Sequence, residues 1–239
     1  MIKLCVFDCD GTLVDSERSI VASMCAAFSA HGIPLPTGDA VRRVVGLSLA
    51  EAVARLLPAC SAQECIRVSR SYRDAIAAMR LDGALFEPLY PGVLEGLEAL
   101  EDQGWCLGLA TGKSHRGAMA TLAAHGLERR FVTLQTPDTA AGKPSPQMMI
   151  QAMAEFGAEP GATVMVGDTT YDMMMARSAG TLAVAVTWGY HGQAELEASG
   201  AHAVVEEFVG IASAIGRLID ALQRRDRMDP AVERGTRRD

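Results

Sequence analysis

Hydrophobic and polar residues follow three different patterns along the chain. An unbroken apolar run at residues 2–7 predicts a strand that is buried on both faces. From Val14 to about residue 79 only helical patterns follow, with apolar residues on one helix face at Ile20, Met24 and Phe28. The sequences SLAE at 48–51 and SAQE at 61–64 are typical capping boxes, so each predicts the start of a helix.

Beyond residue 89 strand patterns alternate with helical ones. Short apolar runs predict five more strands, at residues 105–110, 131–136, 162–167, 182–188 and 201–205. Alternating strands and helices predict an α/β fold with a Rossmann-like parallel sheet wound on both faces. The earlier helical block is then an insertion after the first strand.

These patterns divide the chain into segments. We expect the α/β core to comprise residues 1–14 and 87–222, and the helical insertion to comprise residues 15–86. The last helix is predicted to end at about Leu222. Residues 223–239 are highly charged and have no apolar stripe, so we expect a disordered tail.

Composition excludes several classes of partner. The chain of 239 residues has a formal charge of −7, which argues against nucleic acid and against anionic membrane surfaces. No apolar run approaches the roughly 20 residues of a membrane span. The sequence begins with a strand and not with a secretory signal pattern, so we expect a cytoplasmic protein. Its six cysteines contain no C-x-x-C pair and are predicted to be reduced thiols.

Acidic residues follow the first and fourth strands of the predicted sheet. Asp8 and Asp10 are two residues apart, so in extended chain their side chains point to the same side, and Gly11 then allows a sharp turn. Carboxylates aimed into one cleft repel unless a cation or a proton intervenes. Asp168, after the fourth strand, would supply a third oxygen ligand, and such a set suits Mg²⁺. The alternative is that Asp8 and Asp10 serve only a turn or a helix cap.

A second candidate loop follows the strand at 105–110. The sequence GLATGKS at 108–114 looks like a P-loop, but Leu107 stands where the first glycine of that motif is required. Lysine occurs only at Lys3, Lys113 and Lys143, and the last two lie in glycine-containing loops. We expect Lys113 to be solvated, as most lysines are.

Four motifs occur together in a characteristic order: DCDGTLVDSE from Asp8, TGKS at 111–114, GKPSP at 142–146 and GDTTYDMMMARSAG from Gly167. The sequence LYPGV at 89–93 lies between the first two. In this order they resemble the haloacid dehalogenase superfamily, in the phosphoglycolate-phosphatase-like branch with a small all-α cap. The resemblance covers residues 1–222. It implies a Mg²⁺-dependent phosphatase that acts on a small phosphorylated metabolite.

The resemblance also implies roles for individual residues. Asp8 would be the nucleophile that forms an aspartyl-phosphate, and Asp10 the general acid and base. Phosphate would be bound by Thr111, Gly112 and Lys143. The metal would be held by Asp8, the backbone carbonyl of Asp10 and Asp168, with Asp172 in a water-mediated contact. Asp172 could instead be a first-turn helix cap.

The substrate is less well defined than the chemistry. We expect 2-phosphoglycolate, while a nucleoside monophosphatase or a pyrophosphatase would use the same core residues. A β-phosphoglucomutase-like mutase would need basic residues in the cap, where this chain has Val45 and Leu49, although Arg42 or Arg43 could substitute. A non-catalytic binding protein of the same fold is a further alternative. The oligomeric state cannot be derived from the sequence.

Overall fold

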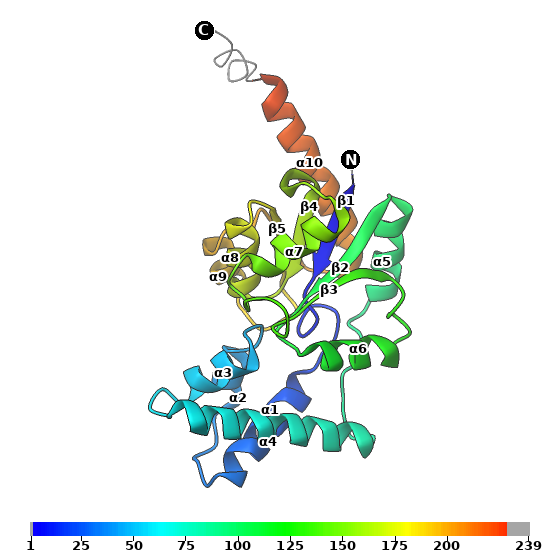
Figure 1. Cartoon of the computed structure of the whole chain (residues 1–239). Helices are drawn as coiled ribbons and strands as arrows, with labels where there is room; N and C mark the ends of the chain where they lie inside the picture. The colour runs from blue at the N-terminus through cyan, green and yellow to red at the C-terminus, as the bar shows by residue number, and fades with distance from the viewer. Residues whose placement is uncertain (1, 229–239) are drawn as a thin grey trace.

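In the computed structural model, which describes residues 2–228, a six-stranded parallel sheet carries helices on both faces (Figure 1). The strand order is β3-β2-β1-β4-β5-β6, and every pair of neighbours is parallel. The predicted fold class is therefore confirmed. The strands are β1 (Lys3–Phe7), β2 (Trp105–Ala110), β3 (Phe131–Gln135), β4 (Thr163–Gly167), β5 (Leu182–Val186) and β6 (Ala203–Val205).

Strand β1 is buried on both sides of the sheet. Cys5 and Phe7 belong to a core completed by α5 (Val93–Asp102), α6 (His115–Ala124), the short η2 (Phe208–Gly210) and α10 (Ile211–Met228). Leu4 and Val6 belong to a second core with α7 (Gln147–Phe156), α8 (Thr170–Ser178) and α9 (Gln193–Ala198). The short η1 (Pro160–Ala162) leads into β4. Successive β1 side chains therefore fill opposite faces, which explains the unbroken apolar run.

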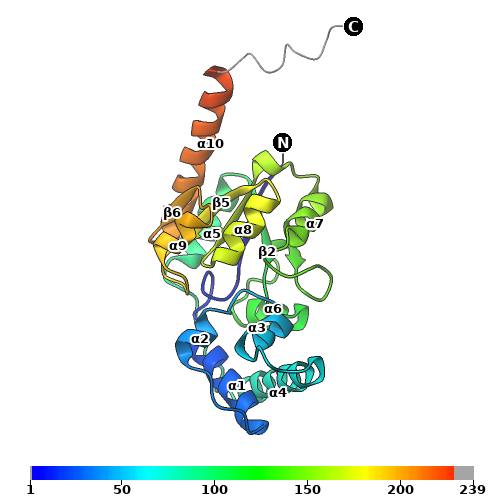
Figure 2. The same ribbon diagram turned by 90° about the vertical axis from the view of Figure 1, so that its left-hand side faces the viewer.

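The inserted helices form a separate layer beside the carboxyl ends of the strands (Figures 1 and 2). They are α1 (Glu17–Ala30), α2 (Gly38–Arg42), α3 (Leu49–Leu56) and α4 (Ala62–Leu81), and they enclose an apolar core of their own. The two connections to the sheet lie side by side, because Val14 and Leu89 form an isolated antiparallel bridge. We call residues 15–86 the cap, and these limits remain a prediction.

The two predicted capping boxes behave differently. Ser61 and Glu64 form a complete box at the start of α4, since each side chain binds the backbone of the other. Ser48 accepts a hydrogen bond from the Glu51 amide at 3.4 Å, but the Glu51 carboxylate binds Arg55. Only half of that box is formed, because an arginine one turn further along the helix competes for the carboxylate.

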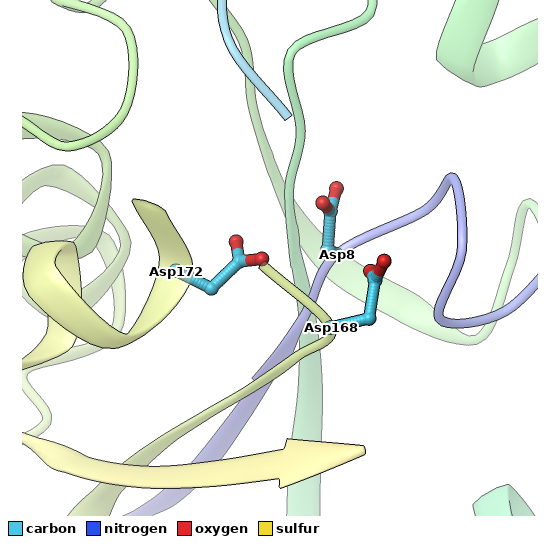
Figure 3. Close-up of side chains that lie close together, drawn as sticks. All are labelled: Asp8, Asp168 and Asp172. Carbon is cyan, nitrogen blue, oxygen red and sulfur yellow. The ribbon is translucent and has the colours of Figure 1, made fainter. Parts of the chain in front are cut away.

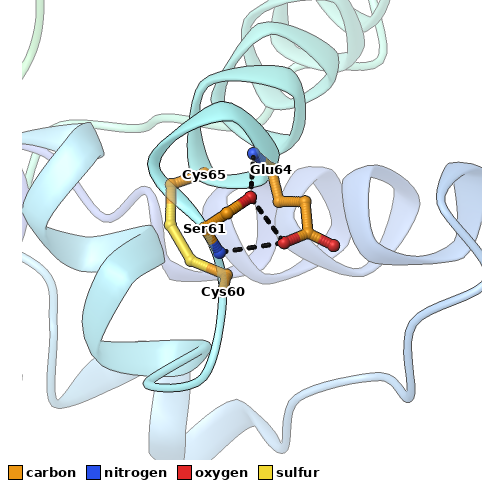
Figure 4. The surroundings of a disulfide bond; sticks show 4 residues. All are labelled: Cys60, Ser61, Glu64 and Cys65. Atoms are coloured by element: carbon orange, nitrogen blue, oxygen red, sulfur yellow. Dashed lines mark hydrogen bonds between the residues drawn. A yellow bond between two sulfur atoms is a disulfide. The ribbon is translucent and has the colours of Figure 1, made fainter.

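The prediction that all cysteines are reduced is wrong, because Cys60 and Cys65 form a disulfide (Figure 4). Cys60 precedes the N-cap Ser61, and Cys65 is the fourth residue of α4. Side chains at these two positions are neighbours at a helix start, where a hydrophobic pair is common. The Cα atoms lie 6.2 Å apart, within bonding range. Cys5, Cys9, Cys25 and Cys106 are free thiols, as expected.

The predicted limit of the last helix is also wrong. Helix α10 continues to Met228, so the first residues of the predicted tail are helical. Extending an existing helix needs no apolar stripe, because each added residue gains a backbone hydrogen bond without a new nucleation step. The remainder of the predicted tail, residues 229–239, lies outside the described residues. Within residues 2–228, no helix has both the length and the apolar character needed to cross a membrane.

Candidate active site

The candidate site lies where the two central strands β1 and β4 end. Asp8 directly follows β1 and Asp168 directly follows β4. These strands are paired, and the Asp8 amide donates to the Val166 carbonyl at 2.9 Å. The strand order reverses at this pair, and such a reversal is the usual ligand position in an open parallel sheet.

Three carboxylates converge at this point (Figure 3). One oxygen from each of Asp8, Asp168 and Asp172 lies within 4.8 Å of the others, and all three side chains are buried. Asp8 and Asp168 point in the same direction from their strands, while Asp172 reaches toward them from the first turn of α8 (Figure 3). We call these three residues the acidic cluster.

The Asp168 carboxylate is fixed by hydrogen bonds from two directions. The Thr12 hydroxyl donates to one oxygen at 2.8 Å, and the Tyr190 amide donates to the other at 2.9 Å. Gly11 allows this approach: its φ is +80°, and a Cβ there would lie 2.2 Å from an Asp168 oxygen. Glycine is therefore required for both backbone conformation and space.

Asp172 is a helix cap and also lies in the acidic cluster, while its predicted water-mediated metal contact remains a prediction. It is the N3 residue of α8, and one carboxylate oxygen accepts from the Thr169 amide at 3.0 Å and from the Thr169 hydroxyl at 2.6 Å. Its other oxygen lies 2.6 Å from Lys143 Nζ, which is itself 2.7 Å from an Asp8 oxygen. The helix cap therefore orients a carboxylate that also belongs to the acidic cluster.

Burial makes the negative charge of the acidic cluster costly. The pKa of Asp8 is raised to about 7, because burial, with a further contribution from Asp172, outweighs the opposing effect of Lys143. Burial, Asp8 and Asp172 likewise raise the pKa of Asp168 well above its ordinary value. Burial disfavours the Lys143 ammonium, but Asp172 and Asp8 outweigh it and keep its pKa above normal. Three carboxylates facing one ammonium fit a divalent cation, and oxygen ligands suit a hard one.

Asp10 lies outside the acidic cluster, and its surroundings correct the prediction for Lys113. The Asp10 carboxylate accepts a hydrogen bond from the Ser16 hydroxyl and lies 2.8 Å from Lys113 Nζ. Lys113 is also 2.9 Å from Glu87, and its side chain is only 13 % exposed. It is therefore not solvated. Burial disfavours its charge, but Asp10 and Glu87 hold its pKa well above the ordinary value.

Thr111 and Gly112 lie between this site and the cap. Thr111 is buried beside Asp8 and Asp10 in a shared cavity, and its hydroxyl accepts from the Lys113 amide at 3.2 Å. A Cβ on Gly112 would lie 2.4 Å from the Leu47 carbonyl of the cap. Close packing of the cap therefore explains this glycine. The predicted phosphate contacts of both residues remain predictions.

The cap is held against the core by polar contacts. Arg43 lies 2.5 Å from Glu195, and the Tyr171 hydroxyl donates to the Arg43 carbonyl at 2.8 Å. Arg42 is bound to Glu17 and Asp39. Both arginines proposed as substitutes for basic cap residues are therefore engaged in ion pairs. Val45 and Leu49 line the cavity between cap and core.

Several residues of this site were not found from the sequence. Lys113, Thr12 and Tyr190 each contact a predicted site residue, and Glu87 contacts Lys113. The scarcity of lysine, with three in the chain, was the one feature that could have favoured a buried role for Lys113. Thr12 lies inside a recognised motif, but nothing in its spacing indicates that it binds Asp168.

Comparisons with known proteins agree with this geometry. A family model for haloacid dehalogenase-like hydrolases matches residues 2–180. "Probable phosphatase IndB" of Dickeya dadantii is 38% identical over 224 residues, which cover 91% of this chain and 96% of that protein. A phosphoglycolate phosphatase of Synechococcus elongatus is 33% identical over 81% of this chain and 88% of its own.

Solved structures extend the likeness to three dimensions. The crystal structure of a predicted phosphoglycolate phosphatase from Haemophilus somnus matches with a TM-score of 0.80 and 26% identity. The match covers 90% of this chain and 98% of that one. The chain therefore belongs to the haloacid dehalogenase-like hydrolases, as a phosphatase of the phosphoglycolate-phosphatase-like branch.

Proposed function

We propose that this protein is a Mg²⁺-dependent phosphatase that hydrolyses a small phosphate monoester through an aspartyl-phosphate on Asp8. The observation that carries the proposal is the convergence of Asp8, Asp168 and Asp172, with Lys143 bound to Asp8 and Asp172, at the edge of a cavity that Asp8 lines together with Asp10 and Thr111. Asp8, Asp168 and the backbone carbonyl of Asp10 would hold the metal, with Asp172 directly or through water. Bound Mg²⁺ would offset charge on the phosphoryl oxygens.

The chain's own residues divide the remaining chemistry between them. A carboxylate oxygen of Asp8 attacks phosphorus, and the bond to the ester oxygen breaks. Asp10 gives its proton to the departing alkoxide. Asp10 then takes a proton from a water molecule, which attacks the phosphorus, releases phosphate and restores Asp8. The Lys143 ammonium, the Thr111 hydroxyl and the Gly112 amide would bind the phosphoryl oxygens.

The separate surroundings of Asp8 and Asp10 support this division. Asp8 lies in the acidic cluster, where a cation would keep it ionised and able to attack. Asp10 contacts Ser16 and Lys113, away from the three convergent carboxylates, yet it lines the same cavity. This difference supports our assignment of the attack on phosphorus to Asp8 and of proton exchange to Asp10.

Within this class, 2-phosphoglycolate is the first compound to test, because several relatives are phosphoglycolate phosphatases. Nucleoside monophosphates and pyrophosphate would require the same core residues. A mutase is less well supported, because Arg42 and Arg43 are bound to acidic side chains and do not line the cavity.

The test is release of free phosphate from a panel of compounds, with Mg²⁺ and with a chelator. We expect release that requires Mg²⁺ from 2-phosphoglycolate or another monoester of the panel. The panel should include nucleoside monophosphates, pyrophosphate and a bisphosphorylated sugar. Transfer between positions of that sugar with little release would indicate a mutase. No turnover of any compound would indicate a binding protein and refute the proposal.

A further inference from the structure

A large cavity lies between the cap and the carboxyl ends of the strands. Its volume is about 650 Å³, and it is bounded by Asp8, Asp10 and Thr111 on the core side. The proposed reaction centre therefore opens directly into this space. The part of the substrate that leaves with the ester oxygen must occupy it.

The cap side of the cavity is apolar. It is formed by Met24, Val41, Val45, Leu49 and Ile76 together with the ring of Tyr72, and several of these belong to the cap's own hydrophobic core. A wall of this kind favours an apolar body, because contact with it removes hydrocarbon surface from water.

The basic residues of the cavity do not change this assignment. Lys113 is bound to Asp10 and Glu87, and Arg80 lies 3.5 Å from Glu87. Arg73 and Arg116 also border the cavity, but both are exposed to solvent. They can therefore meet a polar end of the substrate at the cavity rim, while the interior wall remains hydrocarbon.

The cavity is also larger than 2-phosphoglycolate requires. That molecule has nine non-hydrogen atoms, and at roughly 30 Å³ for each, the volume of a water molecule in the liquid, it fills at most about 270 Å³. Pockets of several hundred Å³ usually hold ligands two or three times larger. Phosphoglycolate would leave most of the apolar wall in contact with water.

We propose that the alcohol portion of the substrate carries an apolar body of ring size, which packs against Val45, Tyr72 and Ile76. This inference rests on the proposed phosphatase function and specifies its substrate class. The phosphate lies beside Asp8 and Thr111, and the ring occupies the space under the cap. A small ester with a second anionic group, such as 2-phosphoglycolate, is then a poor substrate.

The experiment compares phosphate release from 2-phenylethyl phosphate, ethyl phosphate and 2-phosphoglycolate in the presence of Mg²⁺. The first two esters expel similar alkoxides, so their ratio of kcat/KM reports contacts of the ring alone. Burying a group of this size favours 2-phenylethyl phosphate over ethyl phosphate by about tenfold or more. 2-Phosphoglycolate should also fall below 2-phenylethyl phosphate. A ratio near one, or a preference for 2-phosphoglycolate, would overturn the inference.

Two isoleucine variants in α4 test whether the cavity wall causes the preference for 2-phenylethyl phosphate. Ile76→Ala should lower the ratio by at least about threefold, because it removes part of the wall that the ring contacts. Ile66→Ala is the matched control, since Ile66 lies in the same helix, is 54% exposed and does not border this cavity. Equal losses in both variants would contradict the assignment.

Failure of the proposed function can be told apart from failure of this inference. If no ester releases phosphate, the phosphatase proposal fails. Ligand binding then tests whether an apolar ring site is present under the cap. In that case 2-phenylethylphosphonate should raise the melting temperature more than ethylphosphonate does at equal concentration. Equal shifts would refute an apolar ring site under the cap.

Discussion

Lys143 and Lys113 are both largely buried lysines that lie between two carboxylates, but the charges around them differ. Lys143 contacts Asp8 and Asp172, and Asp168 completes the acidic cluster, so three carboxylates face one ammonium. Lys113 contacts Asp10 and Glu87, and Arg80 lies against Glu87, so two carboxylates face two cations. We call this second group the balanced cluster.

The acidic cluster has the excess of negative charge that a bound cation would neutralise. In the balanced cluster, the charges already neutralise one another. Buried like charges are tolerated only when something neutralises them, and in the acidic cluster Lys143 supplies one positive charge for three carboxylates. The balanced cluster needs no further charge and lies where the cap joins the core. Removing a negative charge should therefore cost little stability in the acidic cluster, whereas in the balanced cluster it should destabilise the protein.

The largest expected effect is that of Asp8→Asn on turnover. An amide cannot replace the carboxylate nucleophile, so phosphate release should fall by about 10⁴-fold or more. The melting temperature should stay nearly unchanged, because the substitution removes one of three repelling charges. Phosphate release and thermal unfolding should be measured on the same preparation. Activity close to that of the wild type would remove Asp8 from the nucleophile role.

The next largest effect contrasts the two lysines. Lys143→Met should lower kcat by about 10²- to 10³-fold, because it removes a charge proposed to bind the phosphoryl oxygens. Lys113→Met should lower kcat by less, about tenfold, because Lys113 positions Asp10 and binds no phosphate oxygen in our proposal. The comparison uses kcat and KM for the best ester of the panel. Similar losses in both variants would show that the two clusters do not differ as proposed.

The fold was largely predictable from sequence because its determinants are local. The apolar run of β1 and the alternation beyond residue 89 each reflect burial along a single element, and all six predicted strands are present. The motifs likewise predicted that Asp8 and Asp168 would lie close together, since both directly follow neighbouring strands. The strand register and the sheet topology then fix the positions of these two side chains.

What the sequence could not predict depends on contacts between distant segments. Lys113 is buried because Glu87, 26 residues away in sequence, lies beside it where the cap joins the core. Cys60 and Cys65 pair because a helix begins between them, a geometry that a search for C-x-x-C misses. Residue 112 must be glycine because a Cβ there would clash with the Leu47 carbonyl. None of these contacts produces a periodic pattern of residues in the sequence.

A cation should stabilise the acidic cluster in a pH-dependent manner. Mg²⁺ at about 100 times its Kd should stabilise the fold by about 2.7 kcal/mol, which raises the melting temperature by roughly 5 to 10 °C. The shift should be larger at pH 8 than at pH 6. Without metal the pKa of Asp8 is raised to about 7, so protons compete with Mg²⁺ below that pH.

Two variants assign this Mg²⁺-dependent shift to one cluster. Asp168→Asn should abolish it, because it removes a ligand from the acidic cluster. Glu87→Gln should preserve it, because Glu87 belongs to the balanced cluster. An equal shift in wild type and Asp168→Asn would place the stabilising ion elsewhere.

The smallest expected effect is on stability in the balanced cluster. Glu87→Gln weakens the contacts of a nearly buried carboxylate with Lys113, Arg80 and the Thr121 hydroxyl, so the protein should lose about 1 to 2 kcal/mol. Thermal unfolding without Mg²⁺ measures this loss, and the exposed substitution Glu95→Gln controls for the change in net charge.

The double variant Glu87→Gln with Lys113→Met should lose less stability than the sum of the two single losses. Each single variant leaves the other residue's charge unpaired, whereas the double variant removes both charges. Additive losses would show that Glu87 and Lys113 are not coupled, and the charge balance proposed for this cluster would then be wrong.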